Sequence, residues 1–182
     1  MSFINIEIKA KISSAENIRK YLLANGADFR GTDNQVDTYF NVHTGRLKLR
    51  QGNIENTLIF YERNNQAGPK QSDCKLIEVA EGRMLLEILK SSLGILVEVK
   101  KKREIYFIDN IKIHIDTLND IGYFVEIEAS NKFKDIPVEE LYIQCNDLMT
   151  QFNISPEDLI EHSYSDMILE LKAQSSLLKA QG

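Results

Sequence analysis

Residues 3–12 read FINIEIKAKI, and apolar and polar side chains alternate along this stretch. The apolar set is Ile4, Ile6, Ile8, Ala10 and Ile12, and the polar set is Asn5, Glu7, Lys9 and Lys11. Because successive side chains of a β-strand lie on opposite faces of its sheet, this pattern predicts a strand with one apolar and one charged face. The charged face contacts either water or a ligand, and the rest of the chain bears on that choice.

Seven further stretches repeat the period-two pattern: 35–41, 46–51, 56–63, 74–80, 96–108, 111–117 and 122–129. Helical spacing is found within 13–28, within 82–94 and after Pro137, with a further helix start at Ser155 and a last helix from about Ser163. Loops are short apart from 64–73, and no Ser/Gly-rich linker divides the chain. We therefore expect a single domain over residues 1–182, with an α+β fold whose eight strands pack on each other or close into a barrel.

Composition excludes several classes of protein. The chain of 182 residues is 43% hydrophobic and 27% charged, which is typical of an ordinary soluble globular domain. No apolar run approaches the roughly 18 residues that would span a bilayer, and the N-terminal sequence resembles no secretion signal, so we expect a cytoplasmic protein without a membrane partner. Cys74 and Cys145 lack partners at metal-binding spacing, which predicts reduced, structural thiols. A net charge of -5 argues against a nucleic-acid partner.

The polar strand faces carry an uneven distribution of charge. They hold nine of the 22 basic residues, namely Lys9, Lys11, Arg46, Lys48, Arg50, Arg63, Lys101, Arg103 and Lys112. A solvated face usually mixes charges of both signs. The carboxylates of Glu126 and Glu128 also cluster, with Glu7 and Asp116 available from other strands, and such oxygens can share Mg²⁺ or Mn²⁺. The alternative is an antiparallel sheet whose polar face meets water.

A closed sheet with its apolar face outward, beneath the helices, would enclose these charges in a polar bore. Like charges confined in a low dielectric repel each other strongly unless a ligand compensates them. A polyphosphate with a divalent cation would do so, because Arg and Lys bind phosphate oxygens and the cation bridges them. The sequence has no Gly-rich phosphate-binding loop, so side chains would have to hold the phosphates.

Several motifs extend over nearly the whole chain in one order: NIEIKAK, QVDTYF, RLKLR, GPKQSD, KKREIYF, HID, GYFVEIE and SYSD. In these motifs the chain resembles the CYTH superfamily, the triphosphate tunnel metalloenzymes, and within it the class IV adenylate cyclase-like group. The resemblance implies an eight-stranded closed antiparallel tunnel with flanking helices. It also implies a bound nucleoside triphosphate or inorganic polyphosphate, with Mg²⁺ or Mn²⁺ as the cofactor.

The resemblance implies roles for particular residues. The implied metal ligands are Glu7, Asp116, Glu126 and Glu128, and the implied catalytic residues are Glu7, Lys9, Asp116 and Arg103. The implied phosphate-binding residues are Lys9, Lys11, Arg46, Lys48, Arg50, Arg63, Lys70, Lys101 and Arg103. Lys70 is expected on the 64–73 loop, either over the tunnel mouth or in solvent. Asn5 departs from the family signature Glu-x-Glu-x-Lys, so either Glu7, Glu126 and Glu128 suffice for metal binding or one of two metal sites is weakened.

Other residues keep two interpretations. His114 is either a hydrogen-bonded structural histidine or a proton carrier. Tyr39 and Tyr61 are expected to pack rather than to stack on a base, and Asp37 to orient an arginine across the tunnel. The last helix either caps the barrel or meets a partner, and a homodimer stays open.

Three functions are compatible with this reading. In a cyclase, the ribose 3′-hydroxyl of ATP attacks the α-phosphorus and releases cAMP and pyrophosphate. In a triphosphatase, water attacks the terminal phosphorus of an inorganic, nucleoside or other organic triphosphate. The third is a non-catalytic nucleotide- or polyphosphate-binding module. We expect a metal-dependent enzyme that acts on a triphosphate, with cyclisation ahead of hydrolysis.

Overall fold

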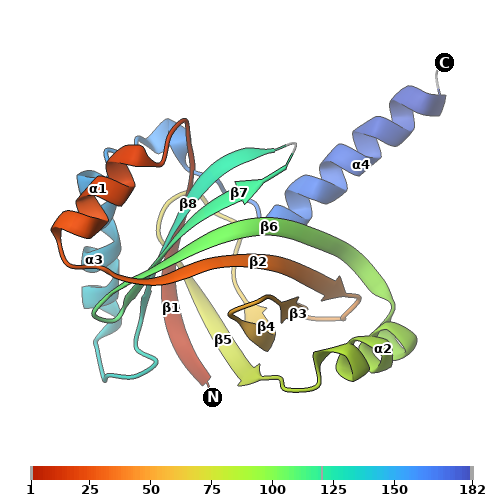
Figure 1. Cartoon of the computed structure of the whole chain (residues 1–182). Coiled ribbons are helices and arrows are strands. Elements are labelled where there is room, and N and C mark those ends of the chain that lie inside the picture. The colour runs from red at the N-terminus through yellow and green to blue at the C-terminus, as the bar shows by residue number, and fades with distance from the viewer. Residues whose placement is uncertain (1, 120, 181–182) are drawn as a thin grey trace.

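A computed structural model describes residues 2–119 and 121–180. Eight strands form a closed antiparallel ring in the order β1-β5-β4-β3-β2-β6-β7-β8, as Figure 1 shows. Their bounds are β1 Ser2–Ile12, β2 Asp28–Phe40, β3 Arg46–Gln51, β4 Asn56–Glu62, β5 Lys70–Glu78, β6 Ile95–Ile108, β7 Ile111–Leu118 and β8 Gly122–Ser130. The first strand closes the ring by pairing with β5 on one side and β8 on the other. The α+β barrel expected from the sequence is confirmed.

Four helices accompany the ring: α1 Glu16–Ala24, α2 Gly82–Leu93, α3 Val138–Gln151 and α4 Tyr164–Ala180. Helices α1 and α3 lie side by side against one flank of the ring, α2 lies at the opposite side, and α4 extends away from the body (Figure 1). Across residues 2–119 and 121–180, no helix has the length and apolarity needed to span a membrane.

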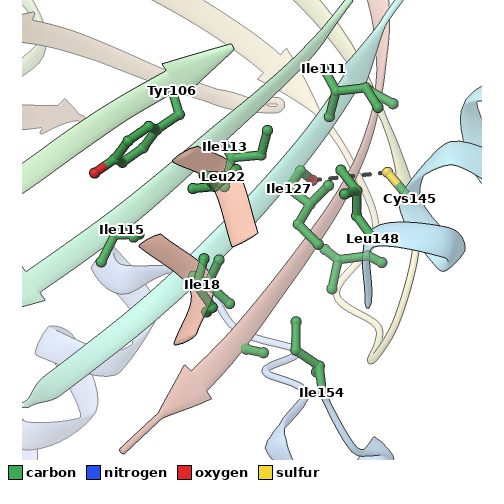
Figure 2. Close-up of a cluster of buried hydrophobic side chains, with 14 of the residues drawn as sticks. Ile18, Leu22, Tyr106, Ile111, Ile113, Ile115, Ile127, Cys145, Leu148 and Ile154 are labelled. Atoms are coloured by element: carbon green, nitrogen blue, oxygen red, sulfur yellow. Dashed lines mark hydrogen bonds between the residues drawn. The ribbon is translucent and has the colours of Figure 1, made fainter. Parts of the chain in front are cut away.

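The hydrophobic core lies outside the ring, between its wall and the helices. Figure 2 shows isoleucines of β7 and β8 facing Ile18 and Leu22 of α1 and the Cys145 and Leu148 side chains of α3. Ile6 and Ile8 of the opening strand are 0% and 1% exposed within this cluster. Burying each such side chain contributes roughly 1.5–3 kcal/mol. The apolar face of β1 is therefore the outer wall of the barrel.

The cysteines are both free and buried, as expected. Cys145 donates its thiol hydrogen to the Ile6 carbonyl at 3.1 Å, which links α3 to the barrel wall. Burial raises the pKa of the Cys145 thiol to about 12, so this group stays protonated.

The strand predicted over 35–41 in fact begins at Asp28. Residues 28–34 lack an apolar alternation, and Gly31 sits at a break in register with a φ of +119°. A glycine tolerates that backbone angle, whereas other residues are strained there. Pairing with the long strand β6 extends β2 where its local sequence does not favour a strand.

Two further predictions of secondary structure were wrong. Residues 70–73 were predicted as loop but belong to β5, where polar Lys70 and Ser72 face inward and no apolar alternation marks the strand. Ser155 starts only a three-residue 3-10 turn, although its capping box with Asp158 is formed. The chain then extends, and the Ile160 amide donates to the Lys9 carbonyl at 2.9 Å, because pairing with β1 replaces a helix.

The first turn of α4 packs against the barrel. Tyr164 is 4% exposed and joins a second buried cluster with Phe124, while Met167 and Ile168 pack beside it. Farther along the helix, Leu171 and Leu177 are 44% and 63% exposed. Of the two expectations for this helix, capping holds for its first turn.

Candidate active site: a charged tunnel

The ring encloses a cavity of about 920 Å³. Predicted site residues in its lining are Glu7, Lys9, Lys48, Arg50, Arg63, Lys101, Arg103, Glu126 and Glu128. The described lining holds nine lysines and arginines against seven carboxylates, so its formal charge is positive although the whole chain is acidic. The charged face of FINIEIKAKI thus points into the barrel through Asn5, Glu7 and Lys9.

A single carboxylate holds three of these cations together. Asp37 of β2 accepts two hydrogen bonds from Arg50, at 2.8 and 2.9 Å. The ammonium groups of Lys101 and Lys48 lie 2.6 and 3.3 Å from its Oδ2 atom. Asp37 holds an arginine as expected, but this arginine is its register partner on the neighbouring strand β3 and does not lie across the tunnel. Even with Glu55, which Arg50 shares with Lys112, the cations outnumber the carboxylates, so positive charge is left for an anionic ligand.

Burial and the neighbouring charged side chains shift the pKa values of Asp37 and Lys101. Burial alone would raise the pKa of the Asp37 carboxyl, but Arg50, Lys101 and Lys48 hold it well below its usual range. The pKa of the Lys101 ammonium is lowered to about 7, chiefly by burial. The charge of Asp37 opposes this shift, whereas the charges of Arg103, Arg50 and Lys48 add to it. Lys101 is therefore the cation in this cluster whose charge changes near neutral pH.

A second cluster surrounds Glu126 on β8. Lys9 Nζ lies 2.8 Å from its Oε1 atom, and Arg103 donates to its Oε2 atom at 2.6 Å. The Lys9 ammonium also sits 3.5 Å from the centre of the Tyr164 ring, in a cation–π contact. Although burial opposes ionisation, Lys9 and Arg103 hold the pKa of Glu126 well below its usual range.

Four predicted site residues lie outside the described cavity lining. Lys11 is exposed beyond Lys9, where it pairs in register with Phe124 near the end occupied by Tyr164. Arg46 pairs with Asp166 of α4 at 3.1 Å. These two basic groups share a strand face with lining residues but lie beyond the described lining.

The other two predicted site residues outside the lining, Lys70 and Asp116, are buried in the barrel wall. Lys70 is 1% exposed and donates to the carbonyls of Gln66, Ile160 and Glu161 at 3.1–3.2 Å, so it neither lies in solvent nor on the predicted loop. Asp116 engages Arg103 through both oxygens. Those bonds leave the Asp116 carboxylate committed to an arginine, in a position where the family resemblance implies a metal ligand.

Sequence reasoning missed five charged residues of the cavity lining: Asp28, Arg30, Glu55, Asp109 and Lys132. Of these, Glu55 contacts the predicted cations. Glu55, in the turn between β3 and β4, accepts from Arg50 at 2.9 Å and forms an ion pair with Lys112. Burial opposes its ionisation, but Lys112 and Arg50 lower its pKa. Glu55 lies in a turn, where side chains do not alternate between two faces, so the sequence around it does not predict that its side chain faces the cavity.

Three residues could hold a divalent cation. The ligand atoms of His114, Glu126 and Glu128 all lie within 4.8 Å of one another. Strand register explains the grouping, because His114 of β7 lies opposite Glu126 of β8, and Glu128 lies two residues farther along β8 on the same face. Glu7 of β1 lies opposite Glu128. The donor set, one imidazole nitrogen and two carboxylates, fits a divalent metal. Glu7 forms an ion pair with Arg63 instead.

The two ends of the cavity differ in chemistry. The end where β1 begins is aromatic and mixed in charge. Its lining holds Phe3, Ile54, Leu76, Ile105, Phe107 and Phe133 together with Asp28, Arg30, Asp109 and Lys132. The opposite end carries Tyr39, Tyr61 and Tyr164 beside the lysines. Tyr39 and Tyr61 are 5% and 7% exposed within a packed cluster, which confirms their packing role.

Asn5 lies in the lining beside Cys74. Its amide Nδ2 is 4.0 Å from the Cys74 sulfur, and Ser72 lies 3.4 Å from the same sulfur. Burial raises the pKa of the Cys74 thiol. The side-chain partner of Asn5 is thus a neutral thiol, while Glu7 lies two positions along the same face of β1.

Comparisons with known proteins agree with this architecture. The family model for the CYTH domain matches residues 4–164. A protein of Methanocaldococcus jannaschii named "Putative adenylate cyclase" is 26% identical over 185 residues, which cover 90% of this chain and 98% of that protein.

Solved structures show the same fold. A Pyrococcus horikoshii protein superposes with a TM-score of 0.75 at 23% identity, covering 89% of this chain and 98% of its own. A Hippeastrum protein, described as an adenylyl cyclase homologue with a dominant triphosphatase activity, has a TM-score of 0.61 at 14% identity, with 94% and 96% coverage.

Proposed function

Because the chain belongs to the CYTH domain family, we propose that it is a metal-dependent enzyme that acts on a triphosphate bound in the tunnel. The proposed reaction is the conversion of ATP to cAMP and pyrophosphate. The name of the archaeal relative, matched along 98% of its length, supports cyclisation.

The convergence of Lys48, Arg50 and Lys101 on Asp37 carries the proposal. These cations are buried or nearly so. Arg50 also pairs with Glu55, which Lys112 shares, so two carboxylates face four cations and do not balance them. Phosphate oxygens would complete the balance, because guanidinium and ammonium groups donate charge-assisted hydrogen bonds to them. Lys9, Arg63 and Arg103 line the same cavity and extend the phosphate-binding surface.

The aromatic end of the cavity supports an organic triphosphate over an inorganic one. Phe3 and Phe107 have ring faces on which a flat ring could stack, in competition with the cations now over them: Lys132 over Phe3, and Arg30 and Lys112 over Phe107. A nucleoside placed there would direct its phosphates toward the lysines and arginines.

Both reactions require charge stabilisation and alignment of the nucleophile with the leaving group. Lys9 and Arg103, with Glu7, are the proposed catalytic residues, since their side chains lie in the lining. Asp116 is proposed as a positioning residue for Arg103. A divalent cation held by Glu126, Glu128 and His114 would neutralise phosphate charge.

The decisive experiment incubates purified protein with ATP or tripolyphosphate in the presence of Mg²⁺ or Mn²⁺. Cyclic AMP with pyrophosphate supports cyclisation, whereas orthophosphate supports hydrolysis. Lys101→Met should abolish turnover, and Lys102→Met should not, because these neighbours on β6 face the cavity and the solvent respectively. Absence of turnover for every triphosphate would overturn the enzyme proposal.

Triphosphate hydrolysis is the second candidate. It is supported by the shared fold with the Hippeastrum protein, whose described activity is mainly triphosphatase. The same incubation separates it from cyclisation through the product formed.

A non-catalytic binding module is the third candidate, and Asn5 is the observation that favours it. Asn5 contacts the neutral Cys74 thiol and supplies no carboxylate. Under this reading, tripolyphosphate would stabilise the fold without turnover, and Asn5→Glu would strengthen metal binding.

A further inference from the structure

His114 occupies an unusual place in the tunnel wall. The residue is 1% exposed and lies opposite Glu126 in the β7–β8 register. Its Nδ1 atom is 3.4 Å from Glu126 Oε2 and 3.5 Å from Glu128 Oε1. The imidazole thus presents one nitrogen to two carboxylates at nearly equal distance.

Neither ring nitrogen makes a good hydrogen bond. Charge-assisted bonds between nitrogen and a carboxylate are typically about 2.7–2.9 Å long, shorter than both contacts of Nδ1. The Nε2 atom is buried and has no hydrogen-bond partner among the described residues. A structural histidine usually satisfies its ring nitrogens, so hydrogen bonding alone does not explain this one.

The two carboxylates are not equally engaged. Glu126 is already contacted by Lys9 and Arg103. Within the described chain, the only ion pair of Glu128 is its 3.5 Å contact with His114. The pair His114 and Glu128 is therefore the least compensated part of the cluster, and Glu126 lies within reach of both.

We propose that His114 Nδ1 is a nitrogen ligand of the divalent cation, together with Glu126 and Glu128, and that it shifts the site's preference from Mg²⁺ toward transition metals. This inference rests on the metal site of the proposed function and names its selectivity. Imidazole nitrogen favours metals such as Co²⁺ and Zn²⁺, whereas an all-oxygen site suits Mg²⁺. With Nδ1 on the metal, Nε2 retains its hydrogen and has no acceptor among the described residues, so the proposal accounts for Nδ1 alone.

Calorimetric titration without triphosphate tests the proposal. Co²⁺ and Mg²⁺ are titrated separately into the full chain and into His114→Gln, whose amide oxygen replaces nitrogen by a harder donor. We expect Co²⁺ affinity to fall about tenfold or more and Mg²⁺ affinity to change by less than about twofold. His43→Gln is the matched control, because His43 is exposed in the turn before β3. Equal losses for both metals, or no loss for either, would overturn the assignment.

A second measurement does not depend on the variant folding. In the proton NMR spectrum of the Co²⁺-loaded native chain, a ligating imidazole gives an exchangeable N–H resonance shifted far outside the ordinary range by the paramagnetic ion. Burial of Nε2 should slow its exchange with water. Absence of such a resonance at saturating Co²⁺ contradicts nitrogen ligation.

The two proposals fail separately. Turnover with Mg²⁺ and no Co²⁺-shifted imidazole signal would retain the enzyme and remove His114 from the metal site. A Co²⁺-shifted signal without turnover of any triphosphate would retain the ligand and remove the proposed reaction.

Discussion

Arg103 and Asp116 face each other across β6 and β7 and form a two-point ion pair, with Nε–Oδ1 and Nη2–Oδ2 distances of 2.6 and 2.5 Å. Both residues are buried, and the Tyr164 hydroxyl donates to Asp116 Oδ2 at 2.9 Å. The pair therefore ties the first turn of α4 to an arginine that faces the cavity. Its geometry assigns Asp116 to holding Arg103.

Asp116→Asn is expected to lower the free energy of unfolding by about 3 kcal/mol, because the buried Arg103 loses its two-point partner and retains only its bond to Glu126. Tripolyphosphate affinity should also fall, while metal affinity measured without phosphate should stay within about twofold. Urea unfolding and calorimetry give these quantities, and Asp135→Asn, an exposed carboxylate, is the control. A large loss of metal affinity would instead make Asp116 a ligand.

Asp37→Asn should destabilise the free protein by a similar amount, about 3–5 kcal/mol, since three cations lose their carboxylate. Tripolyphosphate should then raise the melting temperature more in the variant than in the native chain, because it compensates the same cations. Asp33→Asn is the control, since that buried carboxylate accepts from the amides of Ile54 and Glu55. Equal ligand-induced shifts would contradict a phosphate site at Asp37.

Glu128→Gln is expected to weaken Mn²⁺ binding at least tenfold with little effect on stability, because Glu128 has no lysine or arginine partner within the described chain. Glu55→Gln should leave Mn²⁺ affinity unchanged, although Glu55 lines the same cavity. Calorimetry measures the affinity and urea unfolding the stability. The opposite ranking of the two variants would place the cation beside Glu55.

Binding of tripolyphosphate should take up protons near pH 8. The pKa of Lys101 is about 7 in the free protein, so the group is largely neutral at pH 8. A bound polyanion favours its charged form and raises this pKa, so affinity should fall as the pH rises above about 7. Calorimetry in buffers of different ionisation enthalpy counts the protons, and Lys101→Met should reduce the count while Lys102→Met leaves it unchanged.

The same pKa predicts a stability effect with a definite sign. The unfolded chain holds the Lys101 proton up to about pH 10.4, the usual lysine value, whereas the folded chain releases it near pH 7. Between these values the unfolded state binds more protons, so the Lys101 contribution to stability becomes more favourable as the pH rises. In Lys101→Met, urea midpoints should rise less with pH over this window.

Much of the barrel could be predicted from side-chain alternation, because period two assigns each residue to a face. The outward position of Ile6 and Ile8 and the inward position of Glu7 and Lys9 follow from it directly. Residues 28–34 and 70–73 escaped prediction because their strand structure comes from pairing with β6 and β1 rather than from local preference. Glu55 escaped because a turn has no alternation.

The sequence by itself determined which residues belong to strands with an inward charged face, and its motifs determined the family. Tertiary structure decided which charges meet. Asp37 reaches Lys101, 64 positions away, and Glu55 reaches Lys112, 57 positions away. Alternation specifies a side chain's face but not its depth in the bore or its partner across it. Those depend on the register of all eight strands and on closure of the ring, which also separated Lys11 and Arg46 from the cavity lining.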